Sequence, residues 1–238
     1  MEVKNTSNNG VIDSLFSVGA HFGFAKSRRH PSAKPFIFGI KNKVEIFDLE
    51  KTEIALDKAL EFVKEIGAKK GTILFVGGKN EARGAIEKGA ESLNQPYVSG
   101  RWIGGTLTNF PEIKKRVAKM EDLLSQKEKG ELVKYTKKER LLIDRDIAKM
   151  HKMFSGIVSM KNVPSALFIV DTRQEVTAVK EAKTLNIPVI SLSGSDCDLS
   201  DSLYPIPAND SAKASIEFFV TKVVEAYKAG GLMQKKAE

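Results

Sequence analysis

The sequence predicts an α/β protein with a doubly wound parallel sheet and an inserted antiparallel coiled-coil α-hairpin. Three short apolar runs predict the sheet, at residues 72–76, 166–170 and 188–192. Continuous apolar runs are typical of parallel strands that are buried on both faces. Strands that alternate with helices favour a doubly wound sheet of the Rossmann or flavodoxin type. Residues 111–154 contain no strand pattern and predict the insertion.

The remaining elements follow from periodicity and from turn residues. A strand hairpin is expected at residues 36–40 and 44–47, and helices at residues 11–18, 49–66, 80–93, 174–185 and from Asn209 onward. Together they predict a single α/β domain over residues 1–238. Its parts are an N-terminal helix and basic segment at 11–47, an α/β core at 48–110 and 155–229, and the inserted hairpin at 111–154.

The inserted segment contains two apolar seams with coiled-coil spacing. The first consists of Ile113, Val117, Met120 and Leu124, and the second of Ile143, Ile147, Met150 and Phe154. Gly130 breaks the helical pattern between them, and Thr136 and Glu139 have the spacing of a capping box. Two helices of similar length around a short break predict an antiparallel hairpin. Such a hairpin is either a solvated packing element or an arm that reaches a partner.

The positive charge lies in the first part of the chain. Residues 154–238 carry 9 lysines and arginines against 10 carboxylates, whereas the remaining residues carry 29 against 20. Residues 21–43 contain six lysines and arginines and no carboxylate. Because solvated surfaces normally mix both signs, this segment indicates a polyanionic partner such as a nucleic acid.

Residues 100–110 combine the only tryptophan, Trp102, with Arg101, two adjacent glycines and small polar residues. A planar ring and a guanidinium beside a flexible backbone suit close approach to a sugar-phosphate chain. The other interpretation is a loop in which Trp102 covers the core and the glycines form a turn.

The sequence contains one turn that resembles an enzyme motif. Gly77-Gly78-Lys79 between a strand and a helix resembles a phosphate-binding turn and leaves a nucleotide-binding α/β enzyme as the alternative function. The turn fits neither the Walker A pattern nor the dinucleotide fingerprint. Cys197 is expected to be an unreactive thiol rather than a nucleophile. The carboxylates of the Asp196–Asp201 loop form a solvated turn or hold a hard cation loosely.

Compartment signals are few. No run of 18 apolar residues predicts a membrane span, and residues 1–10 lack the apolar core of a secretory signal. A single cysteine excludes an internal disulfide. We therefore expect a cytoplasmic protein.

Ordered motifs along nearly the whole chain resemble the bacterial ribosomal protein S-two family of the small ribosomal subunit. They occupy residues 19–23, 34–39, 48–52, 73–77, 101–109, 132–139, 164–171 and 206–210. The resemblance implies a structural, non-catalytic protein on ribosomal RNA, without a cofactor or small-molecule substrate. It also implies neighbouring ribosomal proteins, among them ribosomal protein S-one in bacteria that possess it.

The chain departs from the family pattern where relatives usually carry histidine, at Phe24 and Val176, and in the loop at residues 193–199. No metal site is therefore carried over from the resemblance. The residues expected to contact RNA are His21, Lys26, Arg28, Arg29, Lys34, Lys41, Lys43, Lys79, Arg83, Arg101, Trp102, Thr106, Thr108, Asn109, Lys114 and Lys115. A third class of function, a protein–protein scaffold that uses the hairpin, predicts no salt-sensitive RNA binding.

Overall fold

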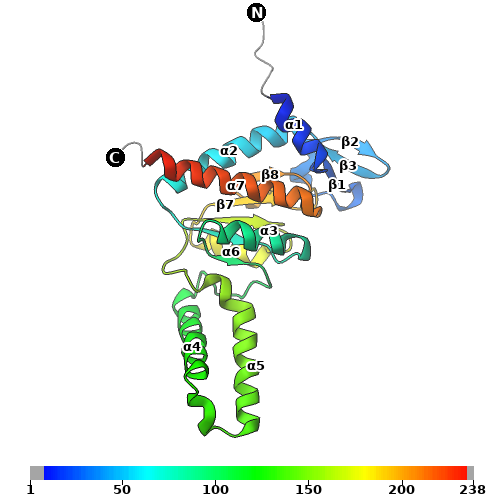
Figure 1. Ribbon diagram of the computed structural model, residues 1–238. Helices are drawn as coiled ribbons and strands as arrows, with labels where there is room; N and C mark the ends of the chain where they lie inside the picture. The colour runs from blue at the N-terminus through cyan, green and yellow to red at the C-terminus, as the bar shows by residue number, and fades with distance from the viewer. Residues whose placement is uncertain (1–7, 235–238) are drawn as a thin grey trace, which may run out of the picture.

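A computed structural model describes residues 8–234 of the chain. Residues 1–7, part of the stretch in which no secretory signal is expected, lie outside this range. The central sheet has five parallel strands in the order β5-β4-β6-β7-β8 (Figure 1). These strands are β4 (Ile73–Val76), β5 (Tyr97–Val98), β6 (Ala166–Val170), β7 (Val189–Ser193) and β8 (Tyr204–Pro207). The predicted α/β fold with a parallel sheet is confirmed.

Helices cover both faces of this sheet because alternate strand residues point to opposite sides. Ile73 and Phe75 of β4 face a core shared with α2 (Leu49–Ala68), α3 (Asn80–Glu91) and α7 (Lys213–Gln234). Leu74 and Val76 face a second core, shared with α6 (Val176–Thr184) and the base of the hairpin. All four side chains are fully buried, which explains why the strand has a continuous apolar sequence.

A second, three-stranded antiparallel sheet lies beside the first and carries the basic segment (Figure 1). It consists of β1 (Phe22–Ala25), β2 (Ile37–Lys41) and β3 (Val44–Phe47), after the N-terminal helix α1 (Asn8–Ser17). The turn residues Asn42 and Lys43 have positive φ angles of 51° and 67°, as a two-residue hairpin requires. The predicted hairpin is present, whereas β1 was not expected.

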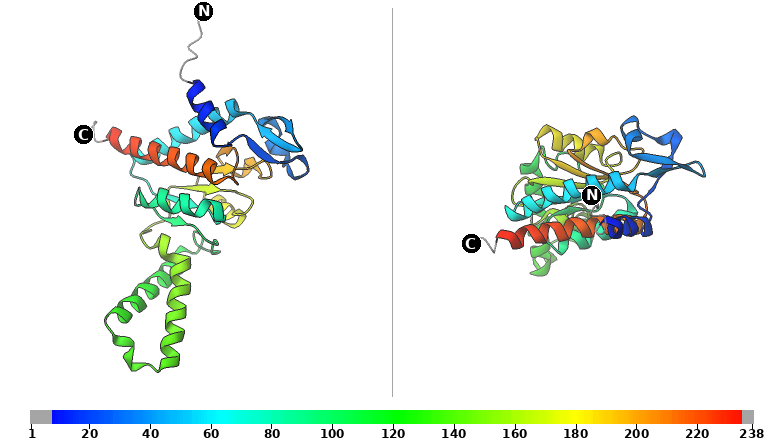
Figure 2. Two further views of the ribbon diagram at one scale, coloured as in Figure 1. Left: turned by 45° about the vertical axis from the view of Figure 1, so that its right-hand side comes forward. Right: turned by 90° about the horizontal axis from the view of Figure 1, so that it is seen from above.

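The inserted segment forms two helices, α4 (Phe110–Glu128) and α5 (Lys137–Phe154), that project from the sheet (Figures 1 and 2). Between them lies the short helix η3 (Glu131–Lys134). Gly130 breaks the segment with a left-handed φ of 73°. The capping box between Thr136 and Glu139 is present.

The predicted seams are buried most completely near the sheet. Ile113, Val117 and Met120 of α4 are buried, as are Ile147 and Phe154 of α5, whereas Leu124 and Ile143 nearer the tip are half-buried. The helical hairpin is therefore present, and supercoiling of its helices stays a prediction.

The prediction missed short or proline-containing strands and placed two helix starts too early. β5 has only two residues, and β8 is an edge strand that contains Pro205 and Pro207. α7 begins at Lys213 rather than Asn209 because the Asn209 side chain accepts hydrogen bonds from the N–H groups of Ser211 and Ala212. α6 begins at Val176 rather than residue 174, after a turn on Asp171.

We expect Ile147→Asp to unfold the hairpin and leave the sheet intact. Ile147 is 6% exposed, so a carboxylate there loses its hydration without gaining a partner, at a cost of roughly 2–5 kcal/mol. Hydrogen exchange should show lost protection confined to α4 and α5. Ala148→Asp, at the exposed neighbouring position, is the control. Loss of protection throughout β4, β6 and β7 would contradict the inserted-arm interpretation.

Candidate nucleic-acid interface

The segment between β1 and β3 presents most of its cations to solvent. The segment lacks the long apolar runs of the core strands and helices. It forms two short helices, η1 (Lys26–Arg28) and η2 (Pro31–Phe36). The exposed cations of this segment are Lys26, Arg28, Lys34, Lys41 and Lys43. Within residues 8–234 none of the five forms an ion pair. Their charges are therefore available to a partner.

Two expected contact residues of the same segment have structural roles instead. Arg29 Nη1 donates to Oε1 of the fully buried Glu45 at 3.0 Å, so its charge is neutralised within the chain. His21 is 8% exposed, and its ring lies between those of Phe16 and Phe22. Burial, and then the charge of Lys41, lowers the pKa of His21, so the ring is neutral at pH 7. The structure therefore does not present either side chain to a phosphate, in contrast to the expectation.

The loop after β7 anchors the basic segment to the parallel sheet. Ser195 is fully buried; its carbonyl accepts the His30 N–H at 2.8 Å and its Oγ accepts the Phe24 N–H at 2.9 Å. A Cβ on Gly194 would lie 2.8 Å from Asp210 Oδ1 and 2.9 Å from Phe24, so only glycine allows this approach. The loop in which the sequence departs from its family pattern thus positions the basic segment.

Residues 100–110 fold around a carboxylate from α6. Glu181 accepts five hydrogen bonds, from the Trp102 indole N–H at 3.0 Å, the N–H groups of Gly105, Leu107 and Thr108 at 2.8, 3.0 and 3.1 Å, and the Thr108 hydroxyl at 3.2 Å. Burial alone would raise the pKa of Glu181, but these donors outweigh burial and hold the pKa below its usual value. The loop is therefore built on an ionised carboxylate.

This arrangement corrects the expectation that Trp102 stacks on a nucleotide. Trp102 is 7% exposed and packs in the second core, so only its edge reaches the surface, where it lines a hollow beside Arg101. Thr106 is 2% exposed, and its hydroxyl donates to the Ile103 carbonyl at 2.6 Å. The alternative interpretation, a loop that covers the core, is the one that the structure supports.

The other expected residues of this region lie at the surface. Arg101, Thr108 and Asn109 are exposed, as are Lys114 and Lys115 in the first turns of α4. Lys114 Nζ donates to the Lys161 carbonyl at 3.0 Å, and Lys115 pairs with Glu112 at 2.6 Å. Both are solvent-exposed contacts of the kind that contribute little to stability.

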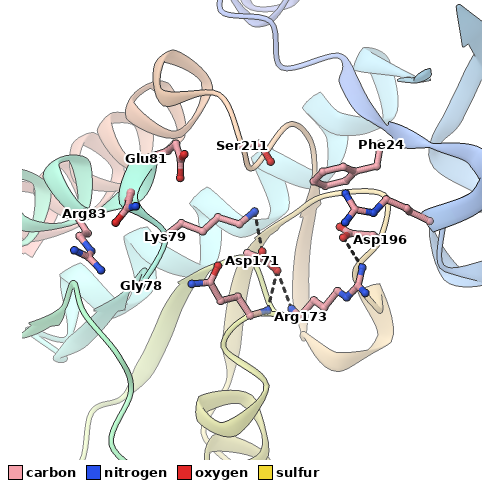
Figure 3. A pocket seen from close by; sticks show the side chains of 12 residues that line it. Phe24, Gly78, Lys79, Glu81, Arg83, Asp171, Arg173, Asp196 and Ser211 are labelled. Atoms are coloured by element: carbon pink, nitrogen blue, oxygen red, sulfur yellow. Dashed lines mark hydrogen bonds and ion pairs between the residues drawn. The ribbon is translucent and has the colours of Figure 1, made fainter. Parts of the chain in front are cut away.

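The turn that resembles a phosphate site is already satisfied by carboxylates. Lys79 Nζ lies 2.7 Å from Asp171 Oδ2 and 3.1 Å from Asp210 Oδ2 (Figure 3 shows Lys79 extended toward Asp171). The Gly78 N–H donates to Glu175 Oε1 at 3.1 Å. A phosphate would have to displace these anions, which argues against the nucleotide-binding enzyme. Lys79, expected to contact RNA, instead forms an internal ion pair.

Asp171, Cys197 and Asp210 could in principle hold a metal, since their ligand atoms lie within 4.8 Å of one another. The Lys79 ammonium already occupies the position of a cation, however, so the cluster does not fit a metal as it stands. Burial, and then the charges of Asp171 and Asp210, raises the pKa of the Cys197 thiol to about 12. The thiol is fully buried and fits the expected unreactive cysteine.

Lys79 and Asp171 lie on the floor of a hollow of about 750 Å³ at the carboxyl edge of the parallel strands, and Cys197 and Asp210 lie beneath it (Figure 3). β4 connects through α3 to β5 on one side, while β6 lies on the other side of β4. Ligands of open α/β sheets bind at such switch points. Arg83, an expected contact residue, is exposed on the wall of this hollow.

Comparison with known proteins decides the family. The model of the family described as ribosomal protein S2 matches residues 15–230. The chain belongs to the ribosomal protein S2 family. It is 39% identical to the small ribosomal subunit protein uS2 of Coprothermobacter proteolyticus over 92% of this chain and 82% of the relative. It is 43% identical to that of Mycobacteroides abscessus over 94% and 81%.

Membership of this family fixes the class of function. The chain is a structural constituent of the small ribosomal subunit and is located in the cytoplasmic ribosome. It is not an enzyme. Independently, no helix within residues 8–234 has both the length and the apolar character needed to cross a membrane.

We expect Glu181→Gln to lower the free energy of unfolding by roughly 2–5 kcal/mol. The amide nitrogen of glutamine cannot accept, so at least two buried N–H groups lose their acceptor, each at a cost of about 1–3 kcal/mol. Because the folded pKa of Glu181 is depressed, its contribution is present above the usual carboxyl pKa and is lost as the pH falls through the folded value. Urea unfolding measures both effects. Glu217→Gln, at an exposed position of α7, is the control, and a loss below about 1 kcal/mol would contradict the assignment.

Asp210 should make folding pH-dependent in the opposite direction. Burial raises its pKa to about 6 although Lys79 opposes the shift. A raised folded pKa stabilises the protein fully below the unfolded pKa and loses that contribution as the pH rises through about 6. Between pH 5 and pH 7, Asp210→Asn should therefore gain roughly 1 kcal/mol of stability relative to the parent protein. Asp13→Asn, at an exposed position of α1, is the surface control, and a pH-independent difference for Asp210→Asn would refute the assignment.

Proposed function

We propose that the chain binds small-subunit ribosomal RNA through phosphate contacts from the basic segment at residues 21–43. The observation that carries this proposal is the separation of its cations into one paired residue, Arg29, and five exposed ones that form no ion pair within residues 8–234. Lysine and arginine neutralise phosphates and release condensed counterions, which gives affinity without sequence readout. The exposed residues Arg83, Arg101, Thr108, Asn109, Lys114 and Lys115 extend the proposed surface.

Neighbouring ribosomal proteins form the second part of the proposal, and the hairpin is the element we assign to them. Val133, Tyr135, Leu141 and Leu142, at and beside the turn between α4 and α5, are 72%, 36%, 51% and 50% exposed. Exposed apolar side chains that gather at one place favour a protein partner. Ribosomal protein S-one is the partner that the family resemblance implies where the organism possesses it.

The RNA proposal is tested with Lys26→Gln combined with Lys34→Gln. If both cations contact phosphates, the slope of log affinity against log salt should fall by roughly 1.4–1.8, since each contact contributes about 0.7–0.9. Filter binding of a small-subunit ribosomal RNA transcript at several salt concentrations measures the slope. The matched control removes two exposed or half-exposed lysines of α7, with Lys213→Gln and Lys222→Gln.

An unchanged slope in the Lys26/Lys34 variant would exclude these lysines from the interface. Arg29→Gln separates binding from folding in the same segment. It strands the buried Glu45 carboxylate, so we expect lower stability and an unchanged salt slope.

A further inference from the structure

Two hollows join along the carboxyl edge of the parallel sheet. The first, of about 750 Å³, is lined by Phe24, Arg28 and Arg83 among others. The second, of about 390 Å³, is lined by Arg83, Arg101, Trp102 and Gly104 among others. Gly78, Arg83 and Gln174 line both, so the two hollows form one continuous depression, which we call the edge trough.

The floor of the edge trough is closed to a small anionic ligand. Its two phosphate-type donors, the Lys79 ammonium and the Gly78 N–H, are held by Asp171, Asp210 and Glu175. Glu175 is only 4% exposed, and this burial raises the pKa of its carboxyl. A mononucleotide that inserts its phosphates here would meet carboxylates rather than free donors.

The rim is different, because its arginines are free. Arg28, Arg83 and Arg101 are exposed, and within the described residues none of them forms an ion pair. Arg173, which also lines the trough, is by contrast neutralised by Asp196 at 2.7 Å. Three guanidinium groups therefore stand along the rim, and guanidinium geometry matches phosphate oxygens.

Phe24 adds an aromatic wall between the rim and the floor (Figure 3). The ring is half-buried, and the Arg28 guanidinium carbon and Lys79 Nζ lie over it, 5.4 Å and 6.0 Å from its centroid, so a base stacks here in place of the exposed Arg28 side chain. Aromatic rings beside a cationic groove bind single-stranded nucleic acid, because every base has a face that stacks. A duplex offers no unstacked base to such a wall.

We propose that the edge trough binds a single-stranded segment of RNA, with phosphates on Arg28, Arg83 and Arg101 and one base against Phe24. The inference rests on the proposed RNA-binding function and adds a second place of contact and the strandedness of the ligand. A strand that crosses the rim needs none of the closed floor donors. This distinguishes the RNA strand from a free nucleotide.

The test uses the full chain and a fluorescein-labelled 12-nucleotide oligouridine, followed by fluorescence anisotropy. Arg83→Gln combined with Arg101→Gln should weaken binding about tenfold at 0.15 M salt and lower the salt slope by roughly 1.4, as expected for two single-strand contacts. Lys88→Gln combined with Lys180→Gln removes the same charge from exposed positions of α3 and α6 outside the trough. This control should bind as the parent protein does.

The aromatic wall has its own variant. Phe24→Leu preserves most of the packing volume and should weaken oligouridine binding at least fivefold, because one base–aromatic stack contributes about 1–3 kcal/mol. Phe218→Leu, at a similarly half-buried ring of α7 outside the trough, is the matched control. Thermal unfolding of each variant verifies that a loss of affinity does not reflect a loss of fold.

The outcomes separate this inference from the function on which it rests. Parent-like oligouridine binding by the Arg83/Arg101 variant would overturn the trough, and so would a protein that binds the ribosomal RNA transcript but not oligouridine. In either case the Lys26/Lys34 salt slope can still support the proposed function. Displacement of oligouridine by millimolar ATP or by a duplex of the same length would also overturn the single-strand assignment.

Discussion

The carboxylate of Glu181 holds together the place where sheet, loop and hairpin meet. Five donors from residues 102–108 converge on it, and α4 begins directly afterwards at Phe110. Trp102, Leu107 and Phe110 pack in the second core beneath this hydrogen-bond network. A glycine-rich loop would otherwise be free to move, and the hairpin would move with it. The Glu181 carboxylate therefore fixes the loop from which the hairpin starts, and apolar packing at the base of α4 and α5 in the second core holds the hairpin against the sheet.

Internal carboxylates also explain why a fold that often carries nucleotides serves as a scaffold here. Asp171, Asp210 and Glu175 satisfy the donors at the switch point of the sheet, where a bound phosphate would otherwise do so. Fold does not determine function, and the residues at the carboxyl edge decide it. In this chain they close the floor of the hollow and leave its rim charged.

The sequence predicts those parts of the molecule that local pattern determines. The apolar runs of β4, β6 and β7, the Asn42-Lys43 turn and the Thr136–Glu139 capping box are each specified within a few residues. Long-range partners are not. Trp102 and Glu181 are 79 residues apart, and nothing in the pattern of α6 marks its single acidic residue as buried. For the same reason Trp102 looks like an RNA-binding ring until its partner is known.

The positive charge of the first half of the chain obeys the same division. Arg29 pairs with the buried Glu45 of β3, and Lys79 pairs with the buried Asp171 and Asp210, which are distant in sequence. Composition alone therefore counts both cations as unpaired. Apart from Arg29 and Lys79, the exposed cations of this part of the chain lie on surfaces that do not contribute to the core. An excess of positive charge destabilises a compact protein by self-repulsion, and a bound polyanion removes this repulsion. The apolar side chains at the tip of the hairpin are likewise exposed. The exposed cations and the exposed apolar tip are both consistent with a protein whose surface is covered by RNA and protein when it assembles into the ribosomal subunit.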